Sequence, residues 1–140
     1  MQNKEKWFLY LTNLLTTVSG WAYAWMIFFV KPVNEWDIIN HPWQKKLQVI
    51  HLLVSPLLIF ALGWIWKQHV LMKIRTKNKE GFLSGWLLIL SFFPMVISGY
   101  SIQVSMETWW RQLYQNIHLV SSALWTMGFI VHLPLAFKKR

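Results

Sequence analysis

The stretch that decides the fold is LQVIHLLVSPLLIFALGWIW, residues 47–66, in which no aspartate, glutamate, lysine or arginine occurs. A helix needs about 20 mainly apolar residues to cross the hydrocarbon core of a bilayer, and this stretch supplies them. A surface helix of a soluble protein would carry a polar face over the same length. Residues 47–66 therefore predict a transmembrane helix.

Three further apolar stretches lie at residues 7–30, 82–102 and 113–137. A proline inside the second stretch and another inside the third are expected to kink these helices without ending them. The first stretch is too long for the apolar region of a secretory signal, and no small-residue cleavage site follows it, so it also predicts a span. The chain is thus expected to be all-α, an integral membrane four-helix bundle that forms one transmembrane domain over residues 1–140.

The composition agrees with a membrane protein and excludes several kinds of chemistry. Hydrophobic residues make up 55% of the chain and charged residues 14%, against roughly 25% charged in a soluble domain. The net charge of +9 sits in short clusters between apolar runs, which is typical of membrane loops rather than of a surface that binds nucleic acid. The chain has no cysteine, which excludes disulfides, iron–sulfur clusters, covalently attached c-type haem and thiol catalysis.

Lysine and arginine are spread unevenly over the segments outside the four stretches. Ten lie in the amino terminus, the second loop and the carboxy terminus, and four lie in the other two loops. Short loops rich in these residues stay on the cytoplasmic side, so both termini are expected in the cytoplasm and the second and fourth helices are expected to run parallel. The ten are Lys4, Lys6, Lys67, Lys73, Arg75, Lys77, Lys79, Lys138, Lys139 and Arg140, and the four are Lys31, Lys45, Lys46 and Arg111.

Four of the five histidines lie on the second and fourth predicted helices, and His41 lies in a loop, where an interfacial role is expected. His118 and His132 are separated by about 21 Å of helix rise and about 40° of rotation. His51 and His69 are separated by about 27 Å and five turns, again on one face. With the two helices parallel, His51 can meet His118 at one depth and His69 can meet His132 at another, as axial ligands of two b-type haems.

Other interpretations of these histidines stay open. The two intervals differ by about 6 Å, of which helix tilt can absorb only part. A kink at Pro56, an unwound last turn or a slanted haem has to absorb the rest, or His69 is no ligand and another residue, such as Met72, replaces it. A single histidine near a helix end is most often an interfacial residue. Zinc is disfavoured because no cysteine and almost no carboxylate accompanies the histidines. A proton relay is disfavoured because the spans hold no acidic or basic residue at mid-depth.

This pattern resembles the small four-helix di-haem cytochromes b, which include the membrane subunits of formate dehydrogenases and nickel-iron hydrogenases. The matching features are His51 early in the second helix and the interval between His118 and His132 in the fourth. The resemblance implies that His51 and His118 ligate one haem and that His132 ligates the other. Hydrogenase-type members supply the last ligand from the first helix, which has no histidine here, so His69 is the available substitute.

The expected function is that of a membrane-embedded b-type cytochrome, which carries electrons across the bilayer between the quinone pool and a redox partner. Haem iron held by two imidazoles has no open coordination position, so its chemistry is one-electron transfer. The chain is expected to be a multi-pass subunit of an oxidoreductase complex in the bacterial inner membrane and not an enzyme alone. Its expected partners are membrane lipid, a quinone, and a periplasmic cytochrome or dehydrogenase subunit. The alternative is a cofactor-free four-helix transporter or assembly factor.

The distribution of lysine and arginine gives a direct test of orientation. A reporter fused after Arg140 should behave as cytoplasmic, and a reporter inserted between Pro32 and Asn40 should behave as external, because cation-rich loops stay inside. Paired alkaline phosphatase and green fluorescent protein fusions measure this. Phosphatase activity at Arg140 together with fluorescence at the first loop would reverse the assignment.

Overall fold

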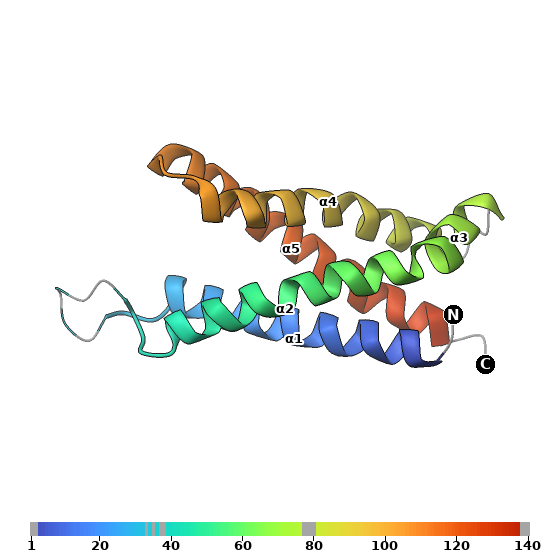
Figure 1. Ribbon diagram of the computed structural model, residues 1–140, viewed down its shortest axis with the longest axis horizontal. Coiled ribbons are helices and arrows are strands. Elements are labelled where there is room, and N and C mark those ends of the chain that lie inside the picture. The colour runs from blue at the N-terminus through green and yellow to red at the C-terminus, as the bar shows by residue number, and fades with distance from the viewer. Residues whose placement is uncertain (1–2, 33, 35, 37–38, 77–80, 138–140) are drawn as a thin grey trace. The chain divides into compact units, whose positions relative to one another are not determined.

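The computed structural model describes residues 3–32, 34, 36, 39–76 and 81–137. All regular structure in these residues is helical, as Figure 1 shows, so the all-α prediction is confirmed. The elements in chain order are α1 (Asn3–Phe28), α2 (Gln44–Ile65), the π-helical segment η1 (Trp66–Leu71), α3 (Met72–Arg75), α4 (Phe82–Val104) and α5 (Thr108–Phe137).

All four helices are longer than the predicted stretches, the second and the fourth most of all. The second apolar stretch belongs to a continuous helix, Gln44–Arg75, which passes through Pro56 and extends beyond residue 66. The fourth begins at Thr108 rather than at residue 113, and the amide of Arg111 donates to the carbonyl of Glu107 at 3.1 Å. Hydropathy places the end of a span where side chains become polar, whereas the backbone stays helical into the polar region. The predicted start of the fourth helix, at about residue 113, is therefore one to two turns too late.

The chain divides into two compact units, Met1–Met72 and Lys73–Arg140, and each is described by itself. In the first unit α1 packs against α2, and in the second unit α4 packs against α5. Each unit is thus a helical hairpin. The grouping of both hairpins into one transmembrane domain, and the cytoplasmic location of the termini, stay predictions. Lys77, Lys79, Lys138, Lys139 and Arg140, which contribute to the orientation argument, lie outside the described residues.

Three helices are long and apolar enough to cross a membrane: Gln44–Arg75, Phe82–Val104 and Thr108–Pro134. Among the described residues α1 does not meet this measure of length and composition. Its sequence is interrupted by hydroxyl and amide side chains and has lysines near its start, which lowers its hydropathy. The chain therefore has the character of a membrane protein, and a fourth crossing by α1 stays a prediction.

The two faces of α1 are the reverse of those in a soluble protein. Thr12 and Ser19 are 2% and 4% exposed, whereas Trp7 is 72% exposed. Polar groups avoid lipid and apolar groups do not, so a helix that contacts lipid carries this pattern. The buried residues are Glu5, Leu9, Thr12, Asn13, Thr16 and Ser19, and the exposed apolar face includes Trp7, Leu11, Leu14, Val18, Trp21 and Trp25.

The loop of the first unit is closed by the side chain of Asn40. Its amide nitrogen donates to the carbonyls of Met26 and Ile27 at 3.2 and 2.9 Å, near the carboxy-terminal end of α1. The backbone amide of Asn40 donates to the side-chain oxygen of Gln44, the first residue of α2. One residue thus satisfies carbonyls that a helix end leaves without intrahelical partners and joins the two helices of the hairpin.

Layers of side chains at intervals of two helical turns join α4 to α5. In the middle layer the rings of Phe92 and Trp125 lie 5.5 Å apart, and both residues are buried. In the layers on either side, a glycine of α4 lies opposite a histidine of α5. Seven residues are close to two turns, so each set of side chains stays on one face of its helix. The layers pair Gly85 with His132, Phe92 with Trp125, and Gly99 with His118.

A row of buried serines runs beside these layers on α4, formed by Ser84, Ser91 and Ser98. Each hydroxyl donates to a carbonyl three or four residues earlier on its own helix, as in the bond of 2.7 Å from Ser91 to Leu87. Small side chains allow helix backbones to approach closely inside a membrane. The serines therefore favour the close approach of α4 and α5 without leaving a polar group without a partner.

Candidate functional site

His51 of α2 lies directly against α1 in the first hairpin. Its Nδ1 is 3.1 Å from the carbonyl oxygen of Thr16 and 3.2 Å from the hydroxyl of Ser19. A Cβ atom built on Gly20 would be 2.8 Å from Cε1 of the imidazole, closer than real side chains allow. The absence of a side chain at Gly20 is therefore what leaves room for the ring.

His118 of α5 has the same arrangement against α4 in the second hairpin. Its Nδ1 lies 2.8 Å from the carbonyl oxygen of Met95. A Cβ atom on Gly99 would lie 3.0 Å from Cε1 and 3.1 Å from Nδ1 of the ring. The imidazole thus lies against the bare backbone of α4 at Gly99, and its Nδ1 is held by a carbonyl of α4.

His132 repeats the arrangement in the layer at the other end of the second hairpin, with one difference. Its Nδ1 lies 2.9 Å from the hydroxyl oxygen of Ser84 instead of a carbonyl oxygen. The ring lies over Gly81 and Gly85, where added Cβ atoms would be 3.4 and 3.9 Å from Cε1. The contact with glycine is therefore looser here than at His118.

His51 and His118 share a chemistry suited to binding a metal. A carbonyl oxygen accepts hydrogen bonds and donates none, so Nδ1 of His51 and Nδ1 of His118 carry the proton. The lone pair of each ring is then on Nε2, the nitrogen that can bind a metal ion. Metal-ligating histidines commonly donate their other ring nitrogen to a carbonyl in this way, which fixes both tautomer and orientation.

His69, the fourth predicted ligand, has a different setting. It lies in η1, where each hydrogen bond spans five residues, and it is half-buried. A turn with more residues than an α-turn rotates the chain less for each residue, so the count of five whole turns from His51 to His69 does not hold in this structure. The residue that does follow His51 at the interval between His118 and His132 is Ile65, which is buried.

The structure does not test the pairing of ligands across the two hairpins. His51 and His69 belong to the first unit, and His118 and His132 belong to the second. Within the second unit, His118 and His132 are too far apart to bind one metal ion, at about 21 Å along α5. Over residues 3–32, 34, 36, 39–76 and 81–137, no three side chains of His, Cys, Asp or Glu come together to hold a metal ion. A haem differs from such a site because the protein supplies only its axial ligands.

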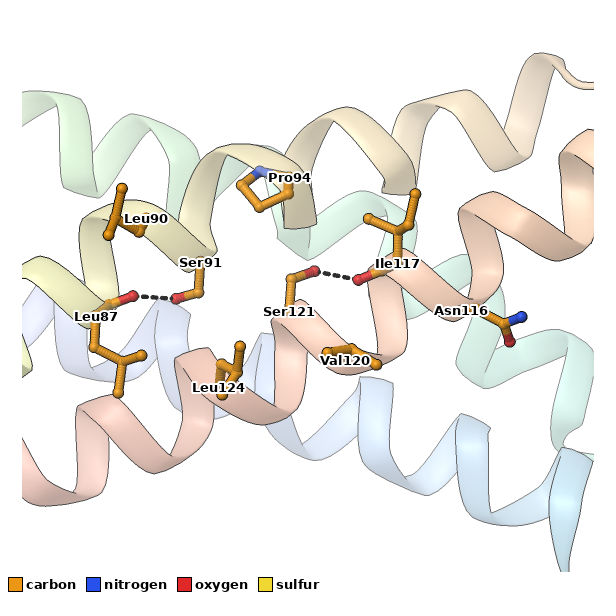
Figure 2. A pocket seen from close by; sticks show the side chains of 9 residues that line it. All are labelled: Leu87, Leu90, Ser91, Pro94, Asn116, Ile117, Val120, Ser121 and Leu124. Atoms are coloured by element: carbon orange, nitrogen blue, oxygen red, sulfur yellow. Dashed lines mark hydrogen bonds between the residues drawn. The ribbon is translucent and has the colours of Figure 1, made fainter.

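An apolar groove of about 440 Å³ lies between α4 and α5, shown in Figure 2, and contains none of the four histidines. Two hydroxyls, of Ser91 and Ser121, line it, and both donate to carbonyls of their own helices at 2.7 and 2.6 Å. The groove therefore presents almost only carbon. Its lining residues are Leu87, Leu90, Ser91, Pro94, Asn116, Ile117, Val120, Ser121 and Leu124.

Sequence reasoning selected the histidines but missed the residues that hold them. Gly63 and Gly128, on the helices that carry the histidines, do not face the rings: beyond the local backbone nothing lies within 4 Å of a Cβ on Gly63, and Gly128 faces leucines of α4. The glycines beside the rings are on α1, on α4 and at Gly81 just before α4, and neither of these two helices has a histidine. A usable signal was present, because Gly85 and Gly99 are separated by the same interval as His118 and His132.

Comparisons of the chain with protein-family models, with curated proteins and with solved structures find no match. The resemblance to di-haem cytochromes b thus rests on the histidine positions and the order of the helices. The geometry of the individual histidines is the remaining evidence about function.

Proposed function

We propose that this chain is a membrane-embedded b-type cytochrome that carries electrons across the bilayer between the quinone pool and a redox partner protein. One observation carries the proposal. Three histidines, on two different hairpins, have Nδ1 within hydrogen-bond distance of an oxygen on the neighbouring helix, and all three rings lie against glycine. A histidine present only to pack or to contact lipid headgroups does not require this combination.

The surroundings of these histidines fit haem better than a bare metal ion. A flat macrocycle needs two axial imidazoles and apolar walls, whereas a zinc ion needs three or four protein ligands at one point. The described residues offer single imidazoles in apolar helices and no cluster of ligands. When bound by two imidazoles, haem supplies one-electron transfer.

We assign His51 and His118 as the axial ligands of one haem. Both donate Nδ1–H to a carbonyl, and both rings lie against a glycine where an added methyl group would push the ring away. We assign His132 and His69 to a second haem. The different setting of His69 in η1 makes it the assignment that most needs a test.

The membrane character of the helices supports the location that the proposal requires. Three helices can cross a bilayer, and the exposed apolar face of α1 is suited to lipid. We propose four crossings with both termini in the cytoplasm, in the bacterial inner membrane. We propose that the chain acts as an electron-transfer subunit, joined to a periplasmic cytochrome or a dehydrogenase subunit and to quinone.

The first test is the visible spectrum of purified protein, with the ratio of haem to chain. We expect red protein with sharp reduced-state bands and two haems per chain. His51→Ala and His118→Ala should each remove the same haem, because each deletes one axial ligand of a single site. Colourless wild-type protein would favour the cofactor-free transporter or assembly factor, and full haem content in both variants would refute the assignment of this pair.

The glycine contacts give a second test, with a matched control in the same chain. Gly20→Ala and Gly99→Ala should reduce the haem content toward one per chain, since the new methyl groups would meet His51 and His118 at 2.8 and 3.0 Å. Gly63→Ala should leave the content unchanged, because no atom lies within 4 Å of its Cβ position. Pyridine haemochrome assays on the three purified variants measure this. Equal haem content in all three would show that the ring contacts do not matter for haem.

The second site is tested through its two ligands. His132→Ala and His69→Ala should each halve the haem content and spare the haem of His51 and His118. Difference spectra of single variants and of the His51→Ala/His132→Ala double variant separate the two haems. Loss in His132→Ala without loss in His69→Ala would exclude His69 and direct the search to its neighbours in the helix, such as Met72.

A further inference from the structure

The three held imidazoles differ in the kind of oxygen that faces Nδ1. For His51 and His118 a backbone carbonyl accepts the proton, at 3.1 and 2.8 Å. For His132 the partner shown is the hydroxyl of Ser84, at 2.9 Å. A carbonyl belongs to the backbone and remains in every variant, whereas a serine hydroxyl can be removed by one substitution.

A serine hydroxyl can accept or donate, so its own proton decides the tautomer of the histidine. The hydroxyl of Ser84 is 3.1 Å from the carbonyl oxygen of Gly81, which can only accept. The single hydroxyl proton has two acceptors within reach, this carbonyl and a neutral Nδ1 of His132. When it goes to Gly81, the oxygen of Ser84 accepts from Nδ1–H of His132, and the lone pair of the ring is on Nε2.

We propose that Ser84 is a positioning residue, which holds His132 in the tautomer and orientation that present Nε2 to a ligand. The ligand in question is the second haem, so this inference rests on the proposed function. Ser84 is 8% exposed and lies one turn from Gly81, with His132 above both glycines of this layer. The three groups form a continuous series of polar contacts, from His132 through Ser84 to the carbonyl of Gly81.

The hydrogen bond also affects the electronic character of the ring. Donation from Nδ1 makes an imidazole a more basic ligand, which stabilises ferric over ferrous iron and lowers the reduction potential. Loss of the Ser84 hydroxyl should therefore raise the midpoint potential of the haem that His132 holds. It should leave the potential of the other haem unchanged, since His51 and His118 each have a carbonyl acceptor.

The experiment compares Ser84→Ala with Ser84→Thr and with Ser91→Ala in the full-length protein. Threonine retains a hydroxyl and should restore the wild-type behaviour. Ser91 is the matched control, because it is buried two turns further along the same face of α4 and donates only to carbonyls of its own helix. Two measurements are made in detergent: ¹⁵N chemical shifts of the histidine ring nitrogens in haem-free protein, and spectroscopic redox titration of haem-loaded protein.

In haem-free wild-type protein we expect the His132 shifts of a ring with the proton on Nδ1, and in Ser84→Ala we expect a mixture of tautomers. In loaded Ser84→Ala one haem should titrate at higher potential, or its affinity should fall by about 10- to 100-fold, as is usual when a hydrogen bond to a ligating histidine is lost. Unchanged shifts in Ser84→Ala, or an Nε2–H tautomer in the wild type, would overturn the role of Ser84. Protein that never takes up haem would refute the proposed function, and the nitrogen shifts of His132 would still decide the role of Ser84.

Discussion

A polar group inside a membrane helix has to find its hydrogen-bond partner within the protein, because lipid offers none. The described part of this chain meets that constraint throughout, since no buried side-chain nitrogen or oxygen in it is without a partner. Hydroxyls do so locally, as when Thr16 donates to the carbonyl of Thr12 at 2.8 Å. The imidazoles of His51, His118 and His132 instead reach an oxygen of the neighbouring helix. The histidines thus join the helices of each hairpin by hydrogen bonds.

That reach is short, and it requires the helices to approach closely. Glycine at the point of contact allows this close approach. Glycine within a helix is about 1 kcal/mol less favourable than alanine, but an alanine methyl group would meet the ring at Gly20 and Gly99. The layers in the second hairpin repeat every two turns, so close contact of glycine and histidine alternates with the larger Phe92 and Trp125 pair. Packing and hydrogen bonding thus reinforce one another in each layer.

The sequence was sufficient for the helices and for the choice of histidines, and less so for their surroundings. Apolar stretches such as residues 47–66 predict helices because length and hydropathy are local properties. The predicted ends were less accurate for the start of α5 at Thr108 and for the end of the second helix, beyond residue 66. At both places the backbone is helical where the side chains are no longer mainly apolar. The partners of His118 could not be predicted, because Met95 acts through a backbone carbonyl, and every residue has one. The register of α4 against α5 decides which carbonyl is used, and register is a property of two helices together.

The π-helical segment η1 affects how the continuous helix Gln44–Arg75 can vary in length. A π-turn accommodates about one residue more than an α-turn, so it amounts to an insertion absorbed within the helix. Deleting one residue from Trp66–Leu71 would return the segment to α-helical form. The rotation of α3 about the helix axis relative to α2 would then stay as it is. The same deletion at any position in Gln44–Ile65 would rotate everything beyond it by about 100°. The helix thus has one place where its length can change without turning one end relative to the other, and His69 lies within it.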